Sequence, residues 1–190
     1  MKLLEEKILA EGTVLPGHIL KVGSFLNQQI DVETLRAIGD EIARLYKGCG
    51  VTKILTIESS GIAMAAAASL AMNVPMVFAK KHKSFNISGS VLCTNVHSYT
   101  HGEDYNVVVS SDYLRSDDVI LLVDDFLAVG NALNGLIDLV RQSGAALAGA
   151  AVAIEKGFQG GGDTLRAQGV RVEALALIDS MTDDTIVFRP

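Results

Sequence analysis

Short runs of aliphatic residues alternate along this chain with segments whose apolar residues recur at helical spacing. The aliphatic runs are typical of strands buried on both faces of a parallel sheet. They cover 53–58, 75–80, 119–123, 151–154 and 170–178. Between them, apolar stripes predict helices, the longest of which follows Asp31 and ends at Gly48. Because strands that alternate with helices form a parallel sheet, the pattern predicts an α/β domain.

Three segments depart from this alternation. Residues 2–10 carry apolar side chains at helical spacing and predict a short amphipathic helix. Residues 13–30 are interrupted by proline and glycine, which predicts irregular cover with short strands. No helical period follows Lys81, where we expect a mobile loop and then an antiparallel hairpin made by 91–99 and 106–114.

Composition limits the class of protein. A chain of 190 residues without a repeat or linker suits a single domain over 1–190. Its formal net charge of −6 argues against a nucleic-acid partner, and its apolar runs are too short for a membrane span. The N-terminus lacks the pattern of a secretory signal, so we expect a cytoplasmic protein. Cys49 and Cys93 have no disulfide or zinc spacing, and no metal site is predicted.

The most informative stretch runs from Val119 to Leu133. Five aliphatic residues lead into Asp124 and Asp125, and then into a small-residue turn that opens the next helix. In open α/β sheets, ligands bind at the carboxyl ends of the strands, and a helix N-terminus offers free backbone N–H groups to a phosphate. We therefore expect this turn to bind phosphate while the two acids accept hydrogen bonds from sugar hydroxyls. The alternative is an ordinary buried strand that ends in an Asp-rich turn.

This stretch resembles the phosphoribosyl-diphosphate motif of the type I phosphoribosyltransferases. Members of that family commonly have Thr-x-Gly-Thr where this chain has Ala-Val-Gly-Asn at 128–131. Both threonine hydroxyls are missing here, so backbone amides of the loop would take over their contacts with phosphate. The resemblance implies that Asp124 and Asp125 are the catalytic residues, stabilising the ribose. It also implies a loop that binds the 5′-phosphate of phosphoribosyl diphosphate. That loop comprises Ala128, Val129, Gly130, Asn131 and Ala132.

Two further turns match phosphate-binding parts of the same family. The turn after the first core strand resembles the family's pyrophosphate loop, which directs backbone amides at the leaving group. It comprises Glu58, Ser59, Ser60 and Gly61. Lys80 and Lys81 follow the next strand, where the family often has a basic pair that reaches the diphosphate, and we favour Lys81. Without the resemblance, these would be an ordinary turn after a strand and a solvated loop.

Four residues are candidates for binding the base. Lys156 and Phe158 follow a buried strand that needs no cation at its tip. Resemblance to purine phosphoribosyltransferases implies that Lys156 meets a ring oxygen and that Phe158 covers the base. Leu20 and Asn27 match positions that line the base site in xanthine-specific members, and Asn27 offers both a donor and an acceptor. The plainer alternatives are a surface lysine beside a core phenylalanine, and a turn asparagine.

The resemblance extends over essentially the whole chain and is strongest to the bacterial xanthine phosphoribosyltransferases. It implies the type I fold, a parallel sheet with helices on both faces and a small hood made by the N-terminal segment and the hairpin. The implied reaction is purine salvage: 5-phosphoribose moves from 5-phospho-α-D-ribose 1-diphosphate to xanthine, giving xanthosine 5′-monophosphate and diphosphate. Mg²⁺ would accompany the diphosphate, and a homodimer is expected.

Two alternatives stay open. The first is the same fold acting on guanine or hypoxanthine. The second is a non-catalytic regulator that senses phosphoribosyl diphosphate. A regulator of that kind would need a basic surface for DNA, which the acidic composition disfavours.

Overall fold

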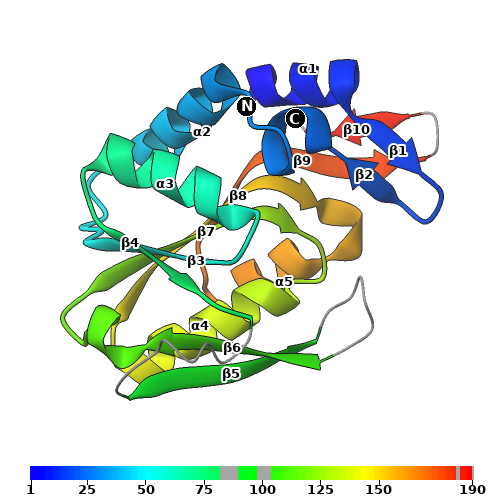
Figure 1. Ribbon diagram of the computed structural model, residues 1–190. Helices are drawn as coiled ribbons and strands as arrows, with labels where there is room; N and C mark the ends of the chain where they lie inside the picture. Colours follow the sequence, from blue (N-terminus) through cyan, green and yellow to red (C-terminus); the bar gives the residue numbers. More distant parts are fainter. Residues whose placement is uncertain (82–89, 98–103, 183–184, 190) are drawn as a thin grey trace.

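A computed structural model describes residues 1–81, 90–97, 104–182 and 185–189. Its centre is a six-stranded sheet in the order β10-β9-β8-β7-β3-β4 (Figure 1). The strands are β3 (Lys53–Ile57), β4 (Met76–Ala79), β7 (Val119–Leu127), β8 (Ala146–Lys156), β9 (Val172–Met181) and β10 (Ile186–Phe188). All neighbours run parallel except β10, which pairs antiparallel with β9 at one edge.

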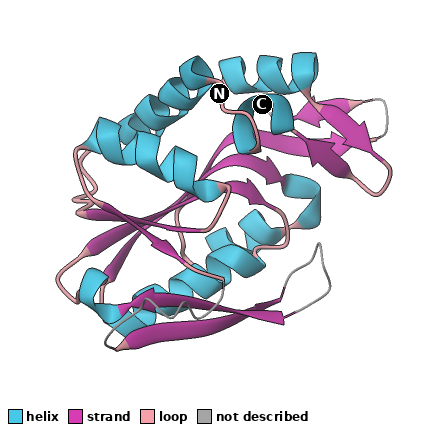
Figure 2. Cartoon of the chain, viewed as in Figure 1, coloured by secondary structure: helices cyan, strands magenta, loops and turns pink. Residues whose placement is uncertain are grey.

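Helices lie on both faces of this sheet, as Figure 2 shows, so the predicted α/β class and its layering are confirmed. One layer comprises α1 (Lys2–Glu11), α2 (Val32–Leu45) and α3 (Gly61–Met72). The other comprises α4 (Asn131–Ser143) and α5 (Gly161–Ala167), with the hairpin β5 (Val91–His97) and β6 (Asp104–Ser110) packed on α4. Within the described residues, no helix is long and apolar enough to cross a membrane.

The N-terminal segment forms the predicted irregular cover. β1 (Thr13–Leu15) and β2 (Ile19–Lys21) make a small antiparallel hairpin, and a π-helical turn spans Gly23–Asn27. His18, at the tip of this hairpin, approaches the carbonyl oxygen of Met181 to 3.0 Å through Nδ1. The hairpin therefore contacts the end of β9, beside the carboxyl edge of the sheet.

Alternating residues of the central strands supply two apolar cores. Leu121 and Val123 of β7 pack on the side of α2 and α3, whereas Ile120 and Leu122 pack on the side of α4. All four are completely buried. Burial of each such side chain stabilises the fold by about 1.5–3 kcal/mol relative to exposure. Packing on both faces explains why the run 119–123 is aliphatic at every position.

Three segments differ from the sequence prediction. β7 continues to Leu127 instead of ending before the acids, because it still pairs with β8 after its pairing with β3 stops at Leu122. Residues 111–113 form a 3₁₀ turn instead of the end of a strand, since the Ser110 hydroxyl accepts a hydrogen bond from the Asp112 N–H at 3.3 Å. The three-residue strand β10 was not predicted. The loop expected after Lys81 falls at 82–89, outside the described residues.

Candidate active site

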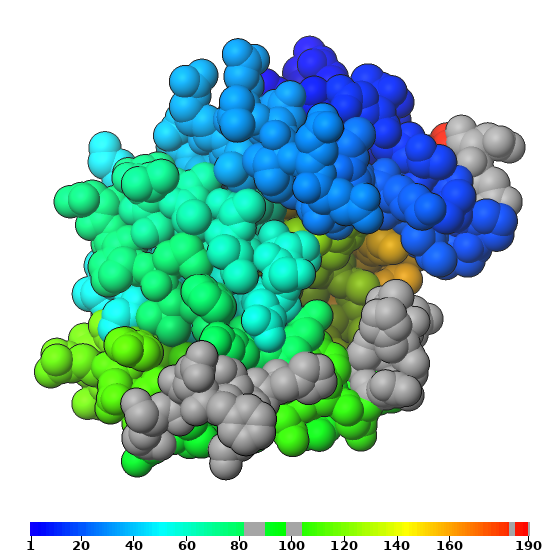
Figure 3. All heavy atoms as spheres, viewed as in Figure 1, coloured from blue at the N-terminus to red at the C-terminus, as the bar shows by residue number. Residues whose placement is uncertain are grey.

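β3, the first strand of the sheet along the chain, has later strands on both sides. The chain adds β4 on one side of β3 and β7, β8 and β9 on the other. Where strand order reverses in this way, the carboxyl ends of the strands diverge and leave the crevice in which open α/β sheets bind ligands. A cavity of about 290 Å³ lies at this edge. Figure 3 shows a hollow below the blue N-terminal segment, with the yellow-green region of β7 at its floor.

The two predicted acids lie in this cavity. Asp124 and Asp125 are 5% and 9% exposed, and the Asp125 N–H donates to Asp124 Oδ1 at 3.0 Å. Burial raises the pKa of the Asp124 carboxyl well above its usual value, the charge of Asp125 adds to this effect, and Lys81 opposes it. Asp124 therefore holds its proton more tightly than a carboxyl in water does. In the described part of the chain, no group of three or more His, Cys, Asp or Glu side chains is placed to hold a metal ion.

The N-terminus of α3 packs directly on Asp124. A Cβ atom on Gly61 would lie 3.0 Å from Asp124 Oδ1 and would collide with Thr56 Oγ1, so glycine is needed for this approach. Thr56 Oγ1 is buried and has no hydrogen-bond partner among the described residues. The Glu58–Ser59 peptide in the preceding turn is cis. The turn predicted to bind pyrophosphate thus lies beside the acid pair.

Glu58 connects this turn to the segment after β4. Its Oε1 accepts a hydrogen bond from the Lys81 N–H at 2.7 Å. Glu58, Ser60 and Lys81 line the cavity, whereas Ser59 and Gly61 do not. The Lys81 ammonium lies 5.4 Å from the centre of the Tyr105 ring, on β6 across the cavity. One positive charge therefore faces the two acids.

The predicted phosphate loop forms the other wall. All five of its residues, 128–132, line the cavity. Gly130 has φ +92°, in the left-handed region that favours glycine, and immediately precedes α4. Gly161 of α5 supports the loop from behind: its N–H donates to the Ala128 carbonyl oxygen at 3.1 Å, and a Cβ there would collide with that oxygen. The loop backbone is thereby fixed at the N-terminus of a 13-residue helix.

Leu20 and Asn27 lie in a separate depression of about 440 Å³, between the end of α1, β2 and the π-helical turn. Leu20 is buried. Asn27 nevertheless reaches the acid pair, because its Nδ2 donates to Asp125 Oδ2 at 3.3 Å. The structure thus brings one predicted base residue into contact with one predicted catalytic acid.

Lys156 and Phe158 line neither of these two hollows. Lys156 Nζ donates to the His18 carbonyl oxygen at 2.8 Å and lies 5.7 Å from the centre of the Phe126 ring. Burial lowers the pKa of this ammonium. Phe158 is 38% exposed, and its ring centroid lies 5.5 Å from that of His18. The ammonium is therefore held by a carbonyl of the N-terminal hairpin, next to a phenylalanine that lines the cavity.

Sequence reasoning missed several residues at the cavity. His97 and Tyr105 line it from the hairpin, and the His97 carbonyl oxygen accepts a hydrogen bond from Asn131 Nδ2 at 3.0 Å. No local signal marks either residue, because the position of the hairpin follows only from the fold. Phe126 directly follows the acids and was detectable from that position. Gly161 belongs to a run of three glycines, which is a usable signal for close backbone packing.

An acid pair, a glycine-initiated helix N-terminus and a lysine lie around one sheet edge, an arrangement suited to a phosphorylated sugar. Residues 28–165 match the family model for the phosphoribosyl transferase domain. The chain belongs to this family, as predicted from the sequence.

Similar proteins give further detail. A xanthine phosphoribosyltransferase of Heliobacterium modesticaldum is 52% identical over 188 residues, spanning 99% of this chain and all of that protein. Another, of Lachnoclostridium phytofermentans, is 50% identical over 191 residues, spanning 100% of this chain and 98% of that protein. The crystal structure of APRTase from Giardia lamblia complexed with 9-deazaadenine has a TM-score of 0.79 and 21% identity, covering 94% of this chain and 98% of that one. This last likeness shows the fold alone.

Proposed function

We propose that the protein is a purine-salvage enzyme that transfers 5-phosphoribose from phosphoribosyl diphosphate to xanthine, producing xanthosine 5′-monophosphate and diphosphate. The observation that carries the proposal is a single cavity lined by the acid pair, the phosphate loop and Lys81. Two full-length relatives at 52% and 50% identity, both named xanthine phosphoribosyltransferase, support the choice of base.

The chain acts on the ribose by electrostatics and positioning, not as a nucleophile. A ring nitrogen of xanthine bonds to ribose C1 as the bond to diphosphate breaks, and that nitrogen loses its proton. Positive charge develops on the ribose ring during this exchange. Asp124 and Asp125 place carboxyl groups beside it in a buried, preorganised site, where such groups act more strongly than in water.

The phosphate loop holds the other end of the sugar. Free N–H groups at the start of α4 bind the 5′-phosphate, helped by the positive end of the helix dipole. A loop with Ala128 and Asn131 in place of two hydroxyl residues can bind phosphate in this way, because the backbone supplies the donors. Gly130 provides the left-handed turn that directs them.

Mg²⁺ would accompany the diphosphate and neutralise part of its charge. This ion prefers oxygen ligands and is commonly held by one or two carboxylates together with substrate phosphates. The carboxylates of Asp124 and Asp125 fit that pattern, and Lys81 adds a cation on the leaving-group side. The cis-linked turn at 58–61 supplies backbone N–H groups to the same diphosphate.

The base occupies the rim formed by the N-terminal hairpin and the end of β8. Asn27 pairs with an edge of xanthine that carries a carbonyl and a ring N–H, and Lys156 donates to a second carbonyl. Phe158 and Leu20 cover the apolar faces of the ring. In this arrangement Asn27, which also contacts Asp125, lies between base and ribose.

We further propose a homodimer that forms over the outer face of α3. The helix, GIAMAAAASLAM, has no charged residue, and a helix that is apolar all round is usually buried. Leu70 is nevertheless 83% exposed and adjoins Val32, which is 74% exposed, across a shallow apolar groove. Exposed patches of this kind mark protein interfaces. A cytoplasmic location fits Cys49 and Cys93, which are both free thiols.

A base panel tests the proposed reaction. Purified protein is incubated with phosphoribosyl diphosphate, Mg²⁺ and one of xanthine, guanine or hypoxanthine, and nucleotide formation is followed by absorbance. Xanthine is expected to be the preferred base, measured as kcat/KM. Preference for guanine or hypoxanthine would overturn the choice of base. No turnover with any base, together with tight binding of phosphoribosyl diphosphate, would favour the regulator.

A further inference from the structure

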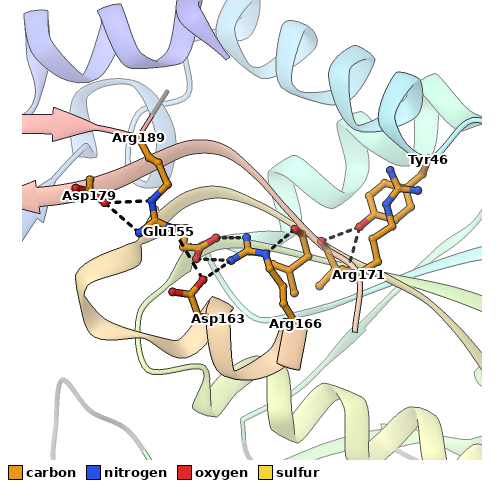
Figure 4. Close-up of polar contacts among 9 residues, drawn as sticks. Tyr46, Glu155, Asp163, Arg166, Arg171, Asp179 and Arg189 are labelled. Atoms are coloured by element: carbon orange, nitrogen blue, oxygen red, sulfur yellow. Dashed lines mark hydrogen bonds and ion pairs between the residues drawn. The ribbon is translucent and has the colours of Figure 1, made fainter. Parts of the chain in front are cut away.

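An ion pair between the buried carboxylate of Glu155 and the partly exposed guanidinium of Arg166 lies behind the proposed base and phosphate sites. Glu155, the penultimate residue of β8, is completely buried. Its Oε2 and Oε1 accept hydrogen bonds from Arg166 Nη2 and Nη1 at 2.6 and 2.9 Å, as Figure 4 shows. Two parallel bonds between a guanidinium and a carboxylate fix orientation as well as distance.

Glu155 adjoins both ligand loops within the sheet. It directly precedes Lys156, the proposed donor to the base. On the neighbouring strand it is in register with Leu127, the residue before the phosphate loop. A change in the position of the Glu155 backbone would therefore move the starts of both loops.

Arg166 is also connected to the phosphate loop through α5. It lies on α5, a helix whose first residue, Gly161, donates to the Ala128 carbonyl oxygen at 3.1 Å. A Cβ on Gly162 would collide with Glu155 Oε1 and lie 2.8 Å from Arg166 Nη1, so glycine lets the helix start directly over the ion pair. The pair thus fixes α5 to β8, and α5 supports the loop.

Arg189 extends the network to residues 156–158, the segment proposed to bind the base and called the base loop here. Its Nη2 lies 3.0 Å from Asp179 Oδ1 and 3.3 Å from the position that a Cβ on Gly157 would occupy. Its Nη1 lies 3.9 Å from Asp163 Oδ1, and Asp163 in turn accepts from Arg166 Nη1 at 3.3 Å. A network of ion pairs therefore runs from Glu155 through Arg166 and Asp163 to Arg189, which lies beside Gly157 (Figure 4).

Stability alone is a weak reason for this arrangement. Burying a carboxylate costs desolvation energy that its partner does not always repay, and apolar side chains of similar volume often stabilise a fold equally well. A forked ion pair instead gives a defined geometry. We propose that Glu155 and Arg166 are positioning residues that hold the base loop and the phosphate loop at a fixed separation, so that xanthine and the ribose meet in line. This inference rests on the proposed function for the identity of the two ligands.

The test compares two variants of the pair with a matched ion pair at the opposite edge of the sheet. Glu155→Gln removes the charge with little change of shape, and Arg166→Lys keeps the charge but loses the fork. The control is Asp118→Asn, which breaks the largely buried bond of 2.6 Å from Lys53 Nζ at the amino ends of β3 and β7. Thermal unfolding, kcat and the KM of each substrate are measured for all three.

Glu155→Gln is expected to lower kcat and to raise KM for both xanthine and phosphoribosyl diphosphate, with a combined loss in kcat/KM of roughly tenfold to a hundredfold, since misplacement of about 1 Å has effects of this size on rate. Arg166→Lys should act in the same direction with a smaller effect, and it decides the matter alone if Glu155→Gln does not fold. Asp118→Asn should lower the melting temperature and leave both KM values unchanged. Lower melting temperatures with unchanged KM in both pair variants would overturn the inference, as would a rise in KM for xanthine alone.

The wild-type protein separates this inference from the proposed function. If it fails to convert xanthine, the proposed function is wrong, whatever the variants do. Titration calorimetry with phosphoribosyl diphosphate and Mg²⁺ then replaces KM in the same comparison. Unchanged affinity in Glu155→Gln and Arg166→Lys would overturn the positioning role for the phosphate loop.

Discussion

Asp124 combines a functional position with an unfavourable environment. Its carboxyl is buried at the end of an apolar strand, next to the charge of Asp125 and under the first turn of α3. Burial raises its pKa first, and the neighbouring acid raises it further. Fold stability alone would favour an apolar residue or an amide at this position. The proposed function gives a reason for an acid there, because it would stabilise the positive charge that develops on the ribose.

Asp124→Asn is therefore expected to stabilise the free protein at neutral pH. The folded pKa of this acid lies above the unfolded value near 3.9, so its favourable contribution is complete below that pH and is lost as pH rises through the folded pKa. Asparagine does not ionise. The melting temperature of the variant minus that of wild type should increase from acidic to neutral pH, as measured by thermal unfolding across that range.

Asp118→Asn is a control for which the change in stability is expected to have the opposite sign. Burial acts to raise the pKa of Asp118, but hydrogen bonds, first from Lys53 and then from the Arg115 backbone, lower it overall. Its contribution is present above the unfolded pKa and is lost as pH falls through the folded value. This variant should be less stable than wild type at neutral pH, and the difference should shrink in acid. A pH-independent difference for Asp124→Asn would contradict the account of the buried acid.

Lys156→Ala tests the proposed donor to the base. Loss of a hydrogen bond from a charged group costs about 1.5–3 kcal/mol, or roughly tenfold to a hundredfold in kcat/KM for xanthine. Affinity for phosphoribosyl diphosphate should barely change, since its contacts lie on other loops. The exposed Lys47, substituted by alanine, is the control. Titration calorimetry of both ligands measures the effect, and unchanged xanthine binding would assign Lys156 a purely structural role at His18.

At the scale of elements, the phosphate loop depends on a helix that follows it by about 30 residues in the chain. α5 contacts the loop through Gly161, where any side chain would enter the loop backbone. The loop itself has small residues and few side-chain hydrogen bonds, so its shape is set by what packs against it. Its geometry is thus a property of β7, α4 and α5 together.

Gly161→Ala is expected to weaken binding of phosphoribosyl diphosphate about tenfold or more, because overpacking that costs 1–3 kcal/mol acts directly on the loop. Gly39→Ala is the matched control, since its Cβ would lie 2.7 Å from the Ala67 backbone, in the contact between α2 and α3. Both variants should lose stability. Calorimetric titration with phosphoribosyl diphosphate should show weaker binding for Gly161→Ala alone, and equal effects in both variants would rule out specific support of the loop.

The elements were predictable to different degrees, for physical reasons. β3, β7 and β8 are buried on both faces, so their aliphatic runs identify them directly, and α2 has a clear apolar stripe. The extension of β7 through Asp124 was not predictable, because it depends on pairing with β8 and not on local sequence. Within the cavity, residues contiguous with a motif were found, whereas His97 and Tyr105 come from a hairpin whose placement is a long-range property.

At the scale of the molecule, the cavity lies away from the apolar face of α3, so the proposed substrate binding and the proposed association of two copies would use different surfaces. The face that carries Leu70 and Val32 lies over the outer sides of α2 and α3. Association through it would bury residues that a single copy leaves in water. The acid pair and the phosphate loop belong to the carboxyl edge of the sheet instead.

Leu70→Glu is expected to convert the dimer to a monomer, since a charge at the centre of an apolar interface is costly to desolvate. Leu9→Glu serves as the control, because Leu9 is also exposed, at 60%, but lies on α1. Sedimentation velocity measures the mass of each variant. A dimer that persists in Leu70→Glu, or a wild-type protein that is already monomeric, would remove α3 from the interface.

We propose that the transfer takes place at the carboxyl edge between β3 and β7 and that the two acids there act on the ribose. The most direct measurement is the rate of xanthosine 5′-monophosphate formation by the double variant Asp124→Asn, Asp125→Asn, with its fold checked by circular dichroism. A folded variant that has lost most turnover, on the order of a hundredfold or more, is the predicted result. A folded variant with turnover near that of wild type would contradict the claim.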